Sequence, residues 1–260
     1  MTSHLAFQRR PFPDPALLRE GLVRRMELAR SVPPVDVRGP HARFLWGELA
    51  TPLEPLRRLL REPLVLERTD NPRVVMLLPG FGTHPLRMRY MARQLEGAGH
   101  TVKRWGLGFN LGPTEANFAA LEQRIRQIHA RYGQKVILVG WSLGGVFARE
   151  LAKRDPSHVA KVITMGSPFS ATPYDNNAWR IYQLVTGHSV EQPPIEARTW
   201  VKPPVETVAL WSPRDGVVSP RSACGLPGER DRAVALRCTH LGFANSPEAI
   251  RAVAREMERG

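Results

Sequence analysis

The fold is decided by residues 136–145, which read Val-Ile-Leu-Val-Gly-Trp-Ser-Leu-Gly-Gly. The apolar, β-branched start of this stretch favours a buried parallel strand, and residues 146–154 after it have the pattern of a helix. Gly140-x-Ser142-x-Gly144 between the two predicts a sharp turn that exposes the serine hydroxyl, with glycines where the two backbones approach too closely for a Cβ. The five-residue pattern also arises by chance, but this strand-and-helix context favours a nucleophile.

Outward from this stretch, strand-like and helix-like segments alternate. Such alternation predicts an α/β fold with a mostly parallel sheet covered on both faces. Residues 169–204 interrupt it and contain a helix expected over 175–185, capped by Asp175 or Asn176, which we interpret as a short helical lid. Short apolar runs predict strands at 64–66, 74–78, 101–105, 136–140, 159–165, 205–211 and 232–237, and periodicity predicts helices at 85–96, 114–132, 146–154 and 247–258.

The first 62 residues differ from the rest of the chain. Helical spacing of apolar residues predicts helices over 14–30 and 51–61, separated by proline-rich breakers. We expect residues 1–62 to be a helical extension packed on a catalytic domain of residues 63–260. Arginines beside the leucines leave a membrane-surface helix as an alternative, although interspersed glutamates dilute that basic face.

Composition limits the classes of function. The 260 residues carry 37 basic and 24 acidic side chains, a net charge of +13. Such an excess suits phosphates or an anionic membrane, but no nucleic-acid motif accompanies it, so a nucleic-acid partner is not expected. No apolar run is long enough to cross a membrane, and residues 1–10 lack the apolar core of a secretory signal. A cytoplasmic protein is the expectation, with association at a membrane surface left open.

Cys224 and Cys238 are the two cysteines of the chain. Free thiols are expected in a cytosolic protein, and a disulfide between them is the alternative. Their spacing does not resemble a zinc site, and no metal is expected.

A serine hydroxyl needs a base in contact with it, and the base must be oriented by a third group. Asp215 lies four residues after one predicted strand and His240 three residues after the next, so both belong at the carboxyl edge of the sheet. The order Ser142, Asp215, His240 is the order that this type of turn requires. Asp231 precedes a strand and is the weaker acid, whereas His84 follows a strand and is expected to line the pocket.

Attack on an ester carbonyl places negative charge on oxygen, and two backbone N–H groups can each lower the barrier by about 3 kcal/mol. Leu143, directly after the nucleophile, is expected to supply one. Phe81, between Gly80 and Gly82 after the strand at 74–78, is expected to supply the other.

These motifs resemble the α/β-hydrolase superfamily, and more narrowly its bacterial esterases and lipase-like members. The resemblance covers about residues 64–258 and is carried by Pro79–Gly82, Gly140–Gly145, Arg214–Gly216 and His240–Gly242. It implies a sheet of about eight strands, acyl transfer to serine and no cofactor. Many members carry histidine before the oxyanion glycine, where this chain has Pro79, so a side chain that orders the loop is missing.

The leading hypothesis is hydrolysis of a small carboxylic ester through an acyl-enzyme on Ser142. The predicted lid helix carries Trp179, Ile181 and Tyr182, so a lipid-like acyl chain suits it. An acyltransferase on the same scaffold is one alternative. A non-catalytic protein on the same scaffold, which binds a ligand or lies at a membrane surface, is the other.

Overall fold

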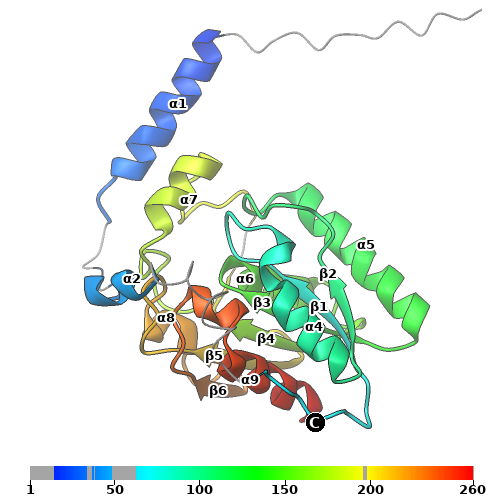
Figure 1. Ribbon diagram of the computed structural model, residues 1–260. Coiled ribbons are helices and arrows are strands. Elements are labelled where there is room, and N and C mark those ends of the chain that lie inside the picture. The colour runs from blue at the N-terminus through cyan, green and yellow to red at the C-terminus, as the bar shows by residue number, and fades with distance from the viewer. Residues whose placement is uncertain (1–14, 34–36, 38, 49–62, 196–197, 260) are drawn as a thin grey trace, which may run out of the picture.

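A parallel sheet of six strands forms the centre of the protein (Figure 1). The computed structural model describes residues 15–33, 37, 39–48, 63–195 and 198–259. The spatial order is β2-β1-β3-β4-β5-β6, and every adjacent pair is parallel. The α/β prediction is therefore confirmed. The strands are β1 (Val74–Leu78), β2 (Thr101–Arg104), β3 (Val136–Trp141), β4 (Val159–Met165), β5 (Glu206–Trp211) and β6 (Arg232–Ala235).

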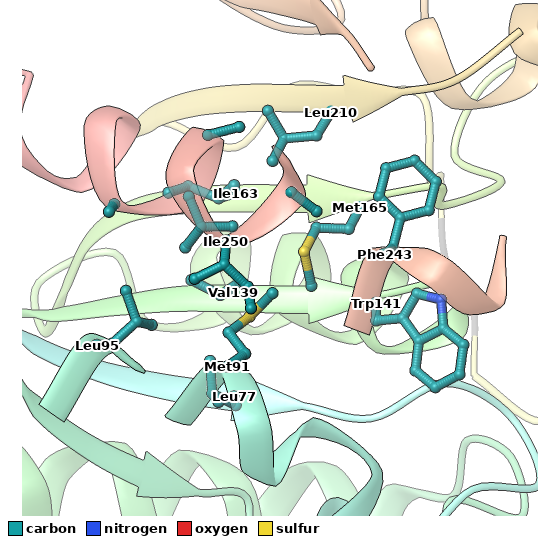
Figure 2. Packing of buried hydrophobic residues seen from close by; sticks show 14 of the residues in the cluster. Leu77, Met91, Leu95, Val139, Trp141, Ile163, Met165, Leu210, Phe243 and Ile250 are labelled. Carbon is teal, nitrogen blue, oxygen red and sulfur yellow. The ribbon is translucent and has the colours of Figure 1, made fainter. Parts of the chain in front are cut away.

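Helices cover both faces of the sheet because successive strand side chains point to opposite faces. On one face, Val139 and Ile163 pack with Met91 and Ile250 from two helices (Figure 2). On the other face, residues such as Leu138 pack against a separate set of helices. The helices on the first face are α4 (Arg89–Gly97) and α9 (Pro247–Glu258). Those on the second face are α5 (Glu115–Tyr132) and α6 (Leu143–Arg154). Three shorter helices are η2 (Pro85–Met88), α8 (Pro220–Cys224) and η3 (Leu241–Ala244).

The expectation of about eight strands is wrong, because the described residues form six. The short run at 64–66 is not a strand. Leu64 is buried but Val65 is 76% exposed, and the charged Glu67 and Arg68 follow before a bend. Leu66 packs, partly buried, against the same core cluster as Leu64, so the segment anchors two leucines there without pairing with a strand.

The lid helix is α7 (Trp179–Thr186), and it begins later than the sequence predicts. Neither Asp175 nor Asn176 is its N-cap. Instead, the side-chain oxygen of Asn176 accepts a hydrogen bond from the N–H of Ala178 (3.0 Å), and the carbonyl of Asp175 accepts one from Ser219 (3.0 Å). These turn contacts compete with helix formation and delay its start.

Two N-terminal helices lie against different parts of the domain. The predicted helix at 14–30 is present as α1 (Pro15–Arg30), which packs on α7 (Figure 1). The guanidinium of Arg25 donates to the carbonyls of Leu184 and Val185, and the amide of Gln183 donates to the carbonyl of Leu28. The sequence analysis missed α2 (Ala42–Glu48), and the helix predicted at 51–61 lies outside the described residues.

Over the described ranges, no helix has both the length and the apolarity that a membrane span requires. The same ranges contain no cluster of histidine, cysteine and carboxylate side chains suited to a metal ion. Cys224 and Cys238 are both free thiols. Burial raises the pKa of the Cys238 thiol, so this thiol stays protonated at neutral pH.

Candidate active site

Ser142 occupies the sharp turn between β3 and α6. Its φ of 53° lies in the left-handed region, which a non-glycine residue rarely adopts. Its N–H donates to the carbonyl of Met165 on β4 (2.8 Å), and its carbonyl accepts from Gly145 (2.9 Å). A Cβ on Gly140 would lie 2.3 Å from the carbonyl oxygen of Gly144. The predicted glycine requirement is therefore confirmed, and the strained turn places Ser142 at the carboxyl edge of the sheet.

Asp215 and His240 follow β5 and β6, and the structure brings their side chains together. His240 Nδ1 lies 2.8 Å from Asp215 Oδ2, and both residues are buried. The other carboxylate oxygen, Asp215 Oδ1, accepts hydrogen bonds from the N–H groups of Val217 and Val218, each at 2.8 Å. The acid is thus fixed on one side by backbone and presents its second oxygen to the imidazole.

A hydrogen bond connects the main chain of His240 to the end of β3. The indole N–H of Trp141 donates to the carbonyl of His240 (3.0 Å), and the two rings are 5.9 Å apart. Because Trp141 immediately precedes Ser142, this contact fixes the histidine loop relative to the serine turn.

Two carboxylates raise the pKa of His240. Burial by itself lowers the pKa of an imidazole, because it disfavours the charged form. Here the charge of Asp215, its hydrogen bond and the charge of Glu48 outweigh burial, and the pKa of His240 lies above its usual value. An imidazolium formed during a proton transfer would be stabilised in the same way.

The loop after β1 is the predicted oxyanion loop, and Asn110 orders it. This fully buried residue accepts at its carbonyl from Gly82 N–H (2.7 Å), donates its N–H to Thr83 (3.0 Å), and donates from its side-chain amide to the carbonyl of Pro79 (2.8 Å). This chain has no histidine at position 79 to order the loop, and Asn110 orders it instead. The sequence analysis missed this role, since the loop at 106–112 carries no motif that would mark it.

Phe81 and Leu143 flank Ser142 on the wall of one cavity. Leu143 is the first residue of α6, where helical N–H groups have no intrahelical acceptor and the helix dipole favours negative charge. The ring of Phe81 packs on Tyr182 of the lid, with centroids 5.3 Å apart. Burial raises the pKa of Tyr182 to about 12, so the lid presents a neutral phenol there.

The cavity beside Ser142 has a volume of about 570 Å³. This volume suits a small organic substrate. Its walls come from the lid helix and the segments on either side of it, from the first turns of α5 and α6, and from the loops after β1 and β5. The lining is largely apolar, and its larger side chains are Phe81, Phe118, Phe147, Trp179, Tyr182, Ile195 and Trp200.

Two weaker candidates lie elsewhere. His84 was expected to line the pocket, but it lines a separate cleft of about 530 Å³ with Arg89 and Arg93. There its Nδ1 accepts from Leu86 N–H (3.3 Å) and caps η2. Asp231 lies at the start of β6, where it accepts from Thr207 N–H (2.8 Å) and pairs with Lys202 (3.0 Å). Asp231 therefore contributes to the amino edge of the sheet.

Comparison with known proteins agrees with this architecture. The family described as "alpha/beta hydrolase fold" matches residues 73–185, which contain the serine turn and the oxyanion loop. The match and the solved structures agree that the chain has the α/β-hydrolase fold.

Among curated proteins, the chain is similar to the pimeloyl-[acyl-carrier protein] methyl ester esterase of Aliivibrio fischeri strain ES114, with 34% identity over 96 residues. The similarity covers 36% of this chain and 35% of that protein. The chain thus matches about a third of the length of this curated relative.

Solved structures share the fold. Lipase BlEst2 of Bacillus licheniformis in its mature form has a TM-score of 0.54 at 15% identity, covering 75% of this chain and 94% of that one. The product of gene lin2722 from Listeria innocua has a TM-score of 0.52 at 18% identity, covering 73% and 95%. At these identities the likeness concerns the fold alone.

Proposed function

We propose that the protein is a serine hydrolase that cleaves carboxylic esters. The observation that carries this proposal is the buried hydrogen bond between His240 Nδ1 and Asp215 Oδ2, with His240 bonded to Trp141, the residue before the strained Ser142. An imidazole held in this tautomer presents its other nitrogen as a base. The α/β-hydrolase fold and the esterase name of the curated relative support the same activity.

In the proposed first half of the reaction, Ser142 Oγ attacks the ester carbonyl while His240 accepts the hydroxyl proton. The N–H groups of Phe81 and Leu143 donate to the oxyanion. The tetrahedral intermediate then collapses, the C–O bond to the alcohol breaks, and His240 returns the proton to the departing alkoxide. Asp215 stabilises the imidazolium between these two steps.

In the second half, water replaces the alcohol. His240 takes a proton from water as the oxygen attacks the acyl-enzyme, and the same two N–H groups hold the second oxyanion. Collapse releases the carboxylic acid and returns the proton to Ser142 Oγ. The reaction consumes one ester and one water and forms one acid and one alcohol, with no cofactor in either half.

The acyl group is proposed to occupy the apolar cavity. Phe147 and Trp179 are among the side chains that would contact it, and the lid residues Ile181 and Leu184 are 59% and 40% exposed at the outer surface. These features favour an acyl chain over a charged acid and support a lipid-like substrate. Because the name of the curated relative specifies a methyl ester, methyl esters belong beside p-nitrophenyl esters of increasing chain length in the substrate panel.

Labelling with a fluorophosphonate tests the proposal. Wild-type protein should form a covalent adduct that Ser142→Ala abolishes, and the same variant should lose ester hydrolysis by about 10⁴-fold or more. Ser170→Ala is the matched control, since Ser170 lines the same cavity without an acid–base pair and its variant should still label. Folded wild-type protein that takes up no label would rule out the serine mechanism. Product analysis with added alcohols separates hydrolysis from acyl transfer.

A further inference from the structure

Glu48 is a buried carboxylate that joins the two loops carrying Asp215 and His240. It is the last residue of α2 and is only 5% exposed. Its Oε1 accepts hydrogen bonds from the N–H groups of Gly216 (3.1 Å) and His240 (2.6 Å), and its Oε2 accepts from Leu241 N–H (2.8 Å). The side chain of Glu48 therefore binds the residue after Asp215, the main chain of His240 and the residue after His240.

The charge of this carboxylate is balanced by backbone donors. A buried carboxylate is costly unless several hydrogen bonds satisfy it. Here three N–H groups converge on it, and within the described residues no salt bridge to Glu48 is recorded. A cation would neutralise such a charge, whereas N–H dipoles leave it available to act on its neighbours.

The packing of α2 shows that the contact is close and specific. A Cβ on Gly216 would lie 2.6 Å from the backbone carbonyl of Phe44 in α2. Gly216 therefore has no side chain at the point where α2 crosses the acid loop. The acid loop is also held from the segment before α7, where the side-chain amide of Asn177 donates to the carbonyl of Gly216 (2.8 Å).

The two loops depend on such links because they follow different strands. A direct hydrogen bond between them runs from Ser212 Oγ to the carbonyl of Cys238 (2.6 Å), close to the ends of β5 and β6. Glu48 adds the links farther out, at the positions of the reacting side chains. A loop shift of about 1 Å at a catalytic group can reduce a rate about 100-fold, so these outer links bear directly on the Asp215–His240 bond.

We propose that Glu48 is a positioning residue of the active site, which holds the acid loop and the histidine loop in register and adds negative charge behind His240. The inference rests on the proposed serine-hydrolase function and deepens it. Glu48 acts through the backbone of the loops and through its field, and it touches no reacting atom.

The negative charge of Glu48 should affect the pH dependence of activity. Two carboxylates face His240: Asp215 from the loop after β5 and Glu48 from α2. Both raise the pKa of the imidazole, and the base works only in its neutral form. Activity therefore rises as the pH increases through this pKa, and removing one negative charge should move that acid limb to lower pH.

Glu48→Gln is the variant that tests both effects. The amide oxygen can still accept from Gly216 and His240, but the –NH₂ then faces the N–H of Leu241. We expect kcat to fall about 10- to 100-fold with KM changed by less than about twofold, and the acid limb of the pH profile to move to lower pH. Near-ultraviolet circular dichroism and thermal unfolding verify that the variant is folded.

Glu256→Gln is the matched control. Glu256 is 4% exposed and pairs with Arg232 (2.6 Å) at the amino end of β6, away from the catalytic loops. It should lose stability while keeping the wild-type kcat and acid limb. A Glu48→Gln enzyme with unchanged kcat and acid limb, or a loss of kcat that Glu256→Gln reproduces, would overturn the proposal.

Glu48→Asp separates the effect of side-chain length from the effect of negative charge. It also tests the proposal if Glu48→Gln does not fold. The shorter side chain keeps the negative charge but cannot reach all three donors, so kcat should fall while the acid limb stays in place. A wild-type kcat would overturn the positioning role. Serine-dependent fluorophosphonate labelling of the wild type is scored separately, so failure of the hydrolase function is distinguished from failure of this inference.

Discussion

The serine turn and the acid–histidine pair are held in different ways. Ser142 is fixed by the neighbouring strand β4 and by the first turn of its own helix, through contacts with Met165 and Gly145. Asp215 and His240 lie on loops joined by Glu48, which is separated from its three donors by 168, 192 and 193 positions along the chain. The serine turn thus depends on local geometry, whereas the Asp215–His240 pair depends on a distant helix.

This contrast explains why a short motif can mark the serine turn but not the positions of Asp215 and His240. The serine turn demands particular residues at fixed spacings, because β3 and α6 approach each other there. The acid and the histidine need only lie after their strands, and any element that reaches the loops can hold them. Substitutions in each half should therefore fail in different ways.

The largest effect is expected from Asp215→Asn, which changes the chemistry of the acid–histidine half and leaves its size intact. An amide cannot hold the imidazole in the required tautomer or stabilise its charged form, so kcat should fall about 10⁴-fold with little change in stability. Steady-state hydrolysis of a p-nitrophenyl ester measures it. Asp231→Asn serves as the control and should retain activity; equal losses in the two variants would contradict the assignment of the acid.

Gly144→Ala should destabilise the serine turn. The added Cβ would lie 2.3 Å from the carbonyl oxygen of Leu78 and 2.7 Å from that of Pro79, both parts of a backbone that cannot move aside cheaply. The free energy of unfolding should fall by about 3 kcal/mol. Denaturant unfolding measures it against Gly97→Ala, whose Cβ would meet no atom within 4 Å. Equal stability of the two variants would show that the close approach does not constrain position 144.

Asn110→Ala should have the smallest effect of the three. It removes the two side-chain bonds, to the carbonyl of Pro79 and from the N–H of Gly112, but leaves both backbone bonds to the predicted oxyanion loop, so stability should fall by about 1–2 kcal/mol and kcat about tenfold. Ester kinetics should show the loss in kcat with KM nearly unchanged, because the oxyanion exists only during reaction. Asn117→Ala, which removes a bond to Gly112, is the control; an equal loss of kcat there would point to a general loosening.

Much of the fold could be predicted because its signals are local. The apolar runs at β1, β3 and β4 and the periodicity of α5 each lie within one segment, and the structure has strands and a helix there. Residues 64–66 were wrongly predicted to form a strand. Three consecutive apolar residues do not show that Val65 is exposed to solvent. The start of α7 was misplaced for a related reason: the side chain of Asn176, a good helix cap by type, hydrogen-bonds within the preceding turn.

Glu48 and Asn110 could not be found from the sequence. A glutamate at the end of a short helix and an asparagine in a glycine-rich loop are ordinary surface residues by type. Their burial and their partners exist only once distant segments meet. Ser142, Asp215 and His240 could be predicted from the sequence because each follows a predicted strand. The structure places Asp215 and His240 in contact.

The separation between Glu48 and its donors also has a consequence for the order of synthesis. Glu48 is made 193 positions before Leu241, the last of its three donors. The serine turn can form once β3, β4 and α6 have emerged, whereas Glu48 can join the two loops only after Leu241 has emerged as well. A nascent chain can therefore carry an ordered serine turn before the loops of Asp215 and His240 are joined, and the proposed active site would be completed after the serine turn.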